Sequence, residues 1–303
     1  MWRRATEADL AAIRSFIEPR ETYATGFSSR LLDTIGRGHG RSGIADAFIL
    51  CTSPEPHSLG ILAAALLGSN GSAFPVLSDG LDSGGPQAVA ALSPLGKLRS
   101  VRGYDKSVCI GASEHAEALE RALLWSPVLA IDYDVMSIDA SGLVHATEAA
   151  SISGDVARMT GMRIEYRRAT IADLDALYPL AADYERTEVM TELHTFDPAL
   201  CRAIQRRSLE RQIVYLASVG DRVVARAQTN ARGWSYDQIG GVYVDPEFRG
   251  LGVGRAVVSA LLADIRTRGR GATLFVKKSN DVAKSLYRAL GFRIIRDYRI
   301  SYF

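Results

Sequence analysis

The feature that most constrains this chain is an internal repeat. Three segments of the first half recur in the same order in the second half, displaced by 164 to 167 residues. They are Arg3–Leu10 with Arg167–Leu174, Ala116–Leu123 with Ala283–Leu290, and Asp132-Tyr133 with Asp297-Tyr298. Seven of eight residues match in the first pair, and the second pair shares the pattern Ala-x-x-Leu-x-Arg-Ala-Leu. Because order and displacement agree, the chain is interpreted as two copies of one domain.

Length and composition agree with two domains. The 303 residues are 47% apolar, which is enough to build two hydrophobic cores. The composition becomes small and polar around Ser141–Gly154, where a connection between the copies is expected. We therefore predict an N-terminal domain over residues 1–150 and a C-terminal domain over residues 160–303.

The order of the expected elements indicates the fold class. A Thr-x-x-Asp sequence near the start of each copy, at Thr6/Asp9 and Thr170/Asp173, predicts the cap of a first helix. Further along, apolar patterns predict strands at 47–52, 60–67, 213–218, 222–229, 237–244, 272–276 and 292–303, and helices at 252–266 and 283–290. Mixed helices and strands predict an α/β or α+β fold, in which each copy is a twisted mixed central sheet flanked by helices.

Several classes of function are disfavoured by composition. No apolar run reaches 18 residues and the N-terminus lacks a secretory pattern, so we expect a soluble, cytoplasmic protein without a membrane partner. Cys51, Cys109 and Cys201 are far apart, which argues against disulfides and a metal site. Residues 1–150 carry 12 Lys and Arg against 17 Asp and Glu, whereas residues 151–303 carry 24 against 17. The basic residues are scattered, so we expect a small phosphorylated ligand and no nucleic acid.

A glycine-rich turn in the second copy is the best candidate for that ligand. Gly250, Gly252 and Gly254 alternate at the point where a strand is expected to turn into a helix. Glycine permits unusual φ values, so successive N–H groups can converge on a phosphate at the positive end of the helix. The same glycines are also compatible with a tight turn and no ligand. Arg255-Ala256 follows Gly254, which excludes a P-loop, and the absence of glycine at Arg255 and Val257 excludes a dinucleotide fingerprint.

Two motifs in order resemble one known family. The first is Arg249-x-x-Gly252-x-Gly254 after the strand end Val242–Glu247, and the second runs from Asn280 to Phe292 and includes Tyr287. Together they resemble the signatures of the GNAT superfamily of acyl-CoA-dependent N-acyltransferases. The resemblance covers residues 163–303.

The resemblance implies that acetyl-CoA is a cosubstrate. Backbone amides from Gly250 to Arg255 would hold its pyrophosphate, Arg249 would complement the charge, and the pantetheine arm would pair with a splayed strand at Val242–Val244. Asn280 would hydrogen-bond the arm. The residues expected to bind the cosubstrate are thus Val242, Tyr243, Val244, Arg249, Gly250, Leu251, Gly252, Val253, Gly254, Arg255 and Asn280.

The resemblance also implies the chemistry. Tyr287 would donate a proton to the departing thiolate, although a helical tyrosine is also compatible with simple packing. Candidates for the general base are Asp237 and Glu188, with Glu192 and His194 as further alternatives. Cys201 lies in a segment typical of helix packing, so direct transfer in a ternary complex is expected.

The first copy lacks the signature residues. Alignment of the repeats places Glu120 opposite Tyr287 and Ser113 opposite Asn280, and residues 70–89 contain no Arg-x-x-Gly-x-Gly. We therefore expect a degenerate N-terminal copy and an active C-terminal copy that acetylates a primary amine of a small molecule or peptide, without a metal, in a monomer or homodimer. The alternative is a non-catalytic acyl-CoA-binding sensor.

Overall fold

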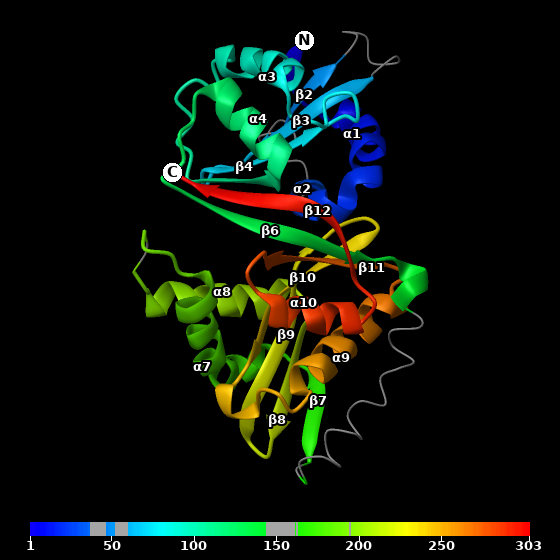
Figure 1. The fold of residues 1–303 in the computed structure, drawn as a ribbon, viewed down its shortest axis with the longest axis vertical. Coiled ribbons are helices and arrows are strands. Elements are labelled where there is room, and N and C mark those ends of the chain that lie inside the picture. Colours follow the sequence, from blue (N-terminus) through cyan, green and yellow to red (C-terminus); the bar gives the residue numbers. More distant parts are fainter. Residues whose placement is uncertain (37–46, 52–59, 144–160, 162, 194) are drawn as a thin grey trace. The chain divides into compact units, whose positions relative to one another are not determined.

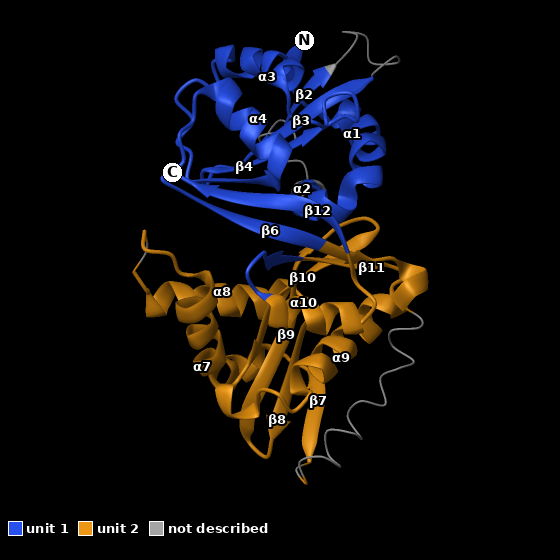
Figure 2. Cartoon of the chain, in the orientation of Figure 1, with its two compact units in different colours: residues 1–135, 275–280, 294–303 blue, residues 136–274, 281–293 orange. Residues whose placement is uncertain are grey.

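The computed structural model describes residues 1–36, 47–51, 60–143, 161, 163–193 and 195–303 (Figure 1). These residues form two compact units that interleave along the chain (Figure 2). Unit 1 comprises Met1–Val135, Phe275–Asn280 and Ile294–Phe303, and unit 2 comprises Met136–Leu274 and Asp281–Arg293. The connection expected between the two copies falls mostly on residues 144–160, outside the described residues.

Unit 1 is built on a mixed sheet with the strand order β1-β2-β3-β4-β5-β12-β6. Its strands are β1 (Trp2–Arg4), β2 (Ala47–Cys51), β3 (Ile61–Leu67), β4 (Ser72–Leu77), β5 (Val108–Ala112), β12 (Arg293–Tyr302) and most of β6 (Leu129–Ile138). Its helices are α1 (Leu10–Ile17), α2 (Glu21–Gly36), α3 (Pro86–Leu92) and α4 (Ser113–Leu123). Apolar side chains from this sheet and from α3 and α4 form one core, which buries Trp2, Leu77, Leu92 and Leu119.

The last strand of the chain belongs to unit 1. β12 pairs antiparallel with β5, from Tyr298 opposite Ala112 to Tyr302 opposite Val108. Arg296 on β12 forms an ion pair with Asp82 at 2.8 Å. Tyr298 is 3% exposed, so this strand contributes to the interior of unit 1.

Unit 2 continues the same kind of architecture with the strand order β11-β10-β9-β8-β7. Its strands are β7 (Ile164–Arg168), β8 (Val214–Val219), β9 (Arg222–Arg232), β10 (Tyr236–Val244) and the first part of β11 (Gly271–Lys277). Its helices are α7 (Leu174–Tyr184), α8 (Pro198–Arg211), α9 (Val253–Thr267) and α10 (Asp281–Ala289). β10 pairs parallel with β11 and antiparallel with β9, which pairs antiparallel with β8.

The helices of unit 2 cover its sheet. α9 packs against β7, β8, β9 and β10, and α7 packs against β9 and β10 (Figure 1). The apolar stripe of α9 is fully buried, as its spacing predicts: Val253, Val257, Leu261 and Ile265 are each at most 1% exposed. The expected mixed α/β fold with helices flanking a central sheet is confirmed. No helix in the described part of the chain has the length and apolar character needed to cross a membrane.

The first repeated segment forms the same local structure in both units. In unit 1 the Asp9 carboxylate accepts hydrogen bonds from the Thr6 amide at 2.8 Å and from Arg3 at 2.5 and 2.7 Å. In unit 2 Asp173 accepts from the Thr170 amide at 2.8 Å and from Arg167 at 2.6 and 2.9 Å. In each unit, the arginine on the strand therefore holds in place, by two hydrogen bonds, the carboxylate that caps the following helix.

From the hydrogen bonds of the Asp9 carboxylate we predict a pH-dependent contribution to the free energy of unfolding. Hydrogen bonding to Arg3 is the largest effect that lowers the pKa of Asp9 from 3.8 to about 2. A depressed pKa in the folded state means that this contribution is present above pH 3.8 and is lost as the pH falls toward 2. We expect Asp9→Ala to lower the free energy of unfolding by about 2 kcal/mol at pH 7, because hydrogen bonds to a charged group are lost.

Urea unfolding at pH 7 and pH 3 measures this effect. The difference between Asp9→Ala and the wild type should shrink at pH 3. Asp105→Ala, an exposed carboxylate of the same unit, is the matched control. A difference that is the same at both pH values would contradict the assignment.

Candidate functional site

The middle of β10 contains a bulge. Gly240 pairs with Gln228 of β9 and Tyr243 pairs with Arg226, so Gly241 and Val242 face a single residue of the partner strand. Pairing with β11 runs from Tyr236 to Ile239, before the bulge. Bulges of this kind re-aim the backbone and are common beside active sites.

Two glycines make the bulge possible. Gly241 has φ +56°, in the region that glycine adopts without strain. A Cβ on Gly240 would lie 1.9 Å from Asn230 Nδ2, and one on Gly241 would lie 3.0 Å from Arg226 Nη2. The side chains of β9 thus occupy the space that side chains at these two positions would need.

The predicted glycine-rich turn lies directly after β10. A short helical turn at Pro246–Phe248 leads into Gly250 and Gly252, which have φ +76° and +81°. Gly252 precedes the first residue of α9, and the amide of Ala256 makes the first bond of that helix, to Gly252 O at 3.1 Å. The amides of the preceding first turn therefore have no partner within the helix. The turn presents consecutive N–H donors at the positive end of a fifteen-residue helix.

Gly254 has a packing role inside this arrangement. A Cβ at this position would lie 3.1 Å from Val244 Cγ2 and 3.4 Å from Leu286 Cδ1. The first turn of α9 therefore packs closely on the end of β10 and on α10. Since Leu286 precedes Tyr287, this packing holds the predicted proton donor beside the helix that carries the turn.

Two arginines flank the turn. Arg249 is exposed, donates from Nε to Val244 O at 3.1 Å, and lies 5.3 Å from the centre of the Tyr243 ring. Arg255 is half-buried, and among the described residues its buried Nε has no hydrogen-bond partner. Both cations thus flank the segment whose amides have no partner within the helix, which suits an anionic ligand.

A group of aromatic residues lies beside the bulge. Tyr184, at the end of α7, makes an edge-to-face contact with Tyr243 at 6.1 Å between ring centres. Burial raises the pKa of Tyr184, and a hydrogen bond from the Gly241 backbone opposes that shift. Burial, with a smaller contribution from Tyr184, also raises the pKa of Tyr287, which is 8% exposed. Tyr287 therefore stays protonated throughout the neutral range.

The remaining predicted ligand residues are distributed between the units. Val242 and Val244 are half-buried and Tyr243 is buried, all on β10. Leu251 lies in the turn between its two positive-φ glycines and Val253 is the first residue of α9. Asn280 belongs to unit 1, where its amide donates to Lys277 O at 2.9 Å in the turn before α10.

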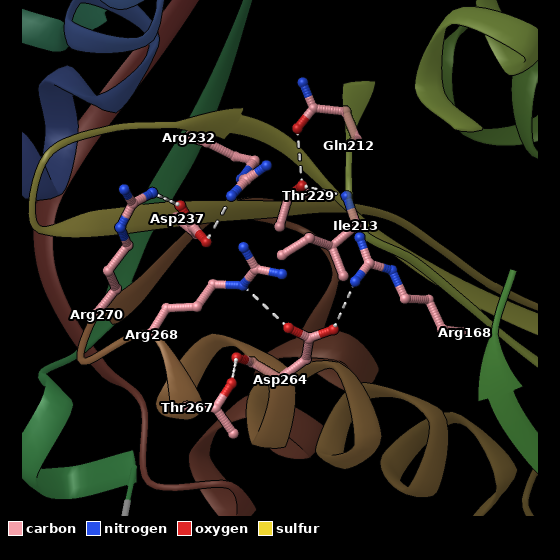
Figure 3. A network of polar contacts seen from close by, with 10 residues as sticks. All are labelled: Arg168, Gln212, Ile213, Thr229, Arg232, Asp237, Asp264, Thr267, Arg268 and Arg270. Atoms are coloured by element: carbon pink, nitrogen blue, oxygen red, sulfur yellow. Dashed lines mark hydrogen bonds and ion pairs between the residues drawn. The ribbon is translucent and has the colours of Figure 1, made fainter. Parts of the chain in front are cut away.

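Asp237 lies at the opposite end of β10 from the turn, in a network of ion pairs (Figure 3). It is fully buried, accepts from Arg270 Nη1 at 2.9 Å, and lies 3.9 Å from Arg232 Nε. Nearby, Asp264 on α9 pairs with Arg268 at 3.0 Å and Arg168 at 3.5 Å. Figure 3 shows Asp237 pointing toward Arg270 and Arg232, an arrangement that ties the strand ends of the sheet together.

The other candidate bases lie after α7. Glu188 is half-buried in the π-helical turn Glu185–Val189, close enough to Tyr184 to influence its ionisation. Glu192 is exposed, and His194 lies outside the described residues. Cys201 is buried on α8 against α7, in agreement with the packing role expected for it.

Sequence reasoning missed a buried polar network beside the bulge. Arg226 donates from Nη1 to Gln205 Oε1 of α8 at 2.6 Å and from Nη2 to Gln228 Oε1. Gln228 donates to Asn230 Oδ1 at 3.0 Å. The signal in the sequence is a run of polar residues at every second position of an otherwise apolar strand, which places them on one face.

Comparisons of the sequence with known proteins relate this segment to acetyltransferases. The sequence model of the family described as FR47-like protein matches residues 224–300. The chain is 50% identical over 58 residues to a mycothiol acetyltransferase of Thermobispora bispora, covering 18% of this chain and 20% of that protein. It is 35% identical over 97 residues to the chloroplastic serotonin N-acetyltransferase 2 of rice, Oryza sativa subsp. japonica, covering 30% and 48%.

A solved structure matches over nearly the whole chain. The GCN5-related N-acetyltransferase of Sphaerobacter thermophilus has a TM-score of 0.58 and is 18% identical, with 99% of this chain and 94% of that chain covered. At this identity the likeness concerns the fold. The chain has the fold of the GNAT acetyltransferases. Its matches span a fifth and about half of the two curated relatives.

The Asp237 network predicts a stability effect. We expect Arg270→Ala to lower the free energy of unfolding by about 3 kcal/mol, because it leaves a buried carboxylate poorly compensated. Adding Asp237→Asn should recover part of that loss. Urea unfolding of both single variants and the double variant measures the coupling, with Arg266→Ala on the exposed face of α9 as control. Additive losses would contradict direct coupling of the two side chains.

Proposed function

We propose that unit 2 is an acyl-CoA-dependent N-acetyltransferase that moves an acetyl group from acetyl-CoA to a primary amine by direct transfer in a ternary complex. The observation that carries this proposal is the turn after β10. Its positive-φ glycines and the first-turn amides of α9 are suited to hold an anion, and the bulge at Gly241 lies on the strand that leads into this turn. The FR47-like match covers the same segment.

The residues present fit acetyl-CoA. The amides of Gly250–Arg255 would hold the pyrophosphate together with Arg249, and the buried, unpartnered Nε of Arg255 is a further donor. Val242–Val244 would pair with the pantetheine arm. Amides at the bulge would polarise the thioester carbonyl, which makes it more reactive toward an amine.

Tyr287 is proposed as the acid that protonates the leaving thiolate. Its buried hydroxyl keeps its proton, and Leu286 packing on Gly254 holds α10 against the first turn of α9. Glu188 suits the role of base better than Asp237, because Asp237 is held by Arg270 far along the strand from the bulge. Glu188 lies beside Tyr184, which contacts the bulge strand.

We also propose that unit 1 is a degenerate copy of the same domain. The matching ion pairs Arg3–Asp9 and Arg167–Asp173 support a duplication. Glu120 stands opposite Tyr287 in the repeat, so unit 1 has no tyrosine at this position; Glu120 is 6% exposed and burial raises its pKa. The loop between β4 and α3 carries Asp79 and Asp82 in place of the arginines of the unit 2 turn.

Calorimetry with acetyl-CoA and a thiol-release assay on a panel of amines test the activity. We expect binding, and acetyl transfer to at least one amine. Tight binding without any transfer would favour the alternative, a non-catalytic acyl-CoA sensor. Absence of binding would overturn both.

Arg249→Ala should weaken acetyl-CoA binding about tenfold, since a charge-assisted contact to phosphate is lost. Calorimetry measures the dissociation constant, and Arg266→Ala at the far end of α9 is the control. Equal affinity of wild type and Arg249→Ala would remove Arg249 from the anion site.

Tyr287→Phe should lower kcat by about 100-fold with little change in acetyl-CoA affinity, because only the proton donor is removed. Since burial raises the pKa of Tyr287 above the ordinary value of 10.0, wild-type kcat should show no loss assignable to tyrosine ionisation below pH 10. Tyr215→Phe is the matched control in the same unit. Unchanged kcat in Tyr287→Phe would remove its proposed role.

A further inference from the structure

Arg226 is a cation buried without an anion. Arg226 is 3% exposed, and no ion pair joins it to a carboxylate of the described residues. The two hydrogen bonds from its terminal nitrogens go to neutral amide oxygens of Gln205 and Gln228. Its Nε and the Nε2 of Gln205 are buried donors without a partner. A buried charge held in this way is expensive unless an anion compensates it.

The protein does not fully compensate the positive charge of Arg226. Burial lowers the pKa of Arg226 to about 10, despite opposing contributions from Tyr184, Cys201 and Glu185. Glu185 is the carboxylate whose charge acts on Arg226, and it starts the π-helical turn after α7. The guanidinium carbon lies 6.0 Å from the centre of the Tyr184 ring. The tyrosine and the two glutamines fix its direction without neutralising it.

The position of Arg226 relates it to the reacting atoms of the proposed function. Its Nη2 lies 3.0 Å from where a Cβ on Gly241 would be, so the guanidinium lies against the bulge. In the proposed acetyltransferase the thioester carbonyl lies at that bulge, and the acceptor nitrogen must approach within bonding range of it. A group that reaches Arg226 from the acceptor is therefore separated from the reacting nitrogen by only a few bonds.

We propose that the acceptor of this enzyme is an amine with a carboxylate close to its amino group, as in an α-amino acid, and that Arg226 is the residue that recognises the carboxylate. This inference rests on the proposed acetyltransferase activity. A planar guanidinium with donors in a fixed fork matches a carboxylate, and Gln205 and Gln228 orient it. The same cation repels acceptors that carry a second ammonium group.

The carboxylate explains the observations better than a neutral acceptor does. A neutral amine would leave the guanidinium uncompensated in the complex, as it is in the free protein. A carboxylate supplies the missing charge and accepts from the Nε donor that has no partner within the protein. Glu185, whose charge acts on Arg226, starts the π-helical turn Glu185–Val189, and single turns of this kind are common at functional sites.

The test uses pairs of acceptors that differ only in the carboxylate. Each α-amino acid is compared with its α-carboxamide in the thiol-release assay with the 303-residue chain, for wild type and for Arg226→Met. Arg226→Met keeps the length of the side chain and removes the charge. Arg206→Met on the exposed face of α8 is the matched control, and unfolding temperatures check that each variant is folded.

For wild type we expect kcat/KM for the acid to exceed that for the amide by about tenfold or more, the size expected when a charged hydrogen-bonding partner is lost. Arg226→Met should abolish this preference while it leaves turnover of the amides within about threefold. Arg206→Met should keep the preference. A preference for amides in wild type, or an equal acid preference in Arg226→Met, would overturn the proposal.

Binding of acetylated products separates this inference from the activity itself. N-acetyl amino acids and their amides are titrated by calorimetry into the protein with CoA present. Tighter binding of the acids to wild type, lost in Arg226→Met, supports carboxylate recognition even where no acceptor in the panel is turned over. If amines are acetylated but Arg226→Met slows acids and amides equally, Arg226 acts on the transfer step and the proposed recognition is wrong. If Arg226→Met fails to fold, Arg226→Gln replaces it with the same expected and contradicting results.

Discussion

The local structure of unit 2 depends on one steric constraint, the absence of side chains at Gly240 and Gly241. Polar side chains of β9 occupy the space that two Cβ atoms would need. A Cβ on Gly240 would lie 1.9 Å from Asn230, and a Cβ on Gly241 would lie 3.0 Å from Arg226. β10 meets this constraint by a bulge with a positive φ at Gly241. The bulge lies shortly before the turn at Asp245, so the predicted anion site, Tyr184 and Arg226 all lie toward this end of β10.

Much of the fold was predictable because its signals are local. The stripe on α9 and the strand at 272–276 follow from apolar spacing, and the Thr-x-x-Asp caps follow from a three-residue pattern that the structure realises at both Asp9 and Asp173. The glycine turn was predictable for the same reason. The membership of β12 in unit 1 was not, because it depends on pairing with β5, which lies about 190 residues earlier in the chain.

In the candidate site, too, local features could be predicted and contacts between distant segments could not. Gly250 and Gly252 lie in the turn and Gly254 in the first turn of α9, so their proximity follows from the sequence alone. The surroundings of Asp237 and Arg226 were harder to predict, because the partners of a charged side chain on a strand come from other segments of the chain. Asp237 meets Arg270 and Arg232 and becomes part of an ion-pair network, whereas Arg226 meets only neutral glutamines. Neither outcome is encoded in the residues adjacent to them in the chain.

The two buried charges of unit 2, Asp237 and Arg226, differ in whether the protein itself compensates them. The Asp237 carboxylate is compensated by nearby arginines, so its burial is consistent with a purely architectural role. Arg226 has no such compensation, and a methionine of similar volume would satisfy the packing without the cost of desolvating a cation. A fold optimised for stability alone has no use for a charge at that position. Because the guanidinium lies against the bulge where the proposed reaction takes place, the simplest account of its cost is that an anionic group of the substrate supplies the missing partner.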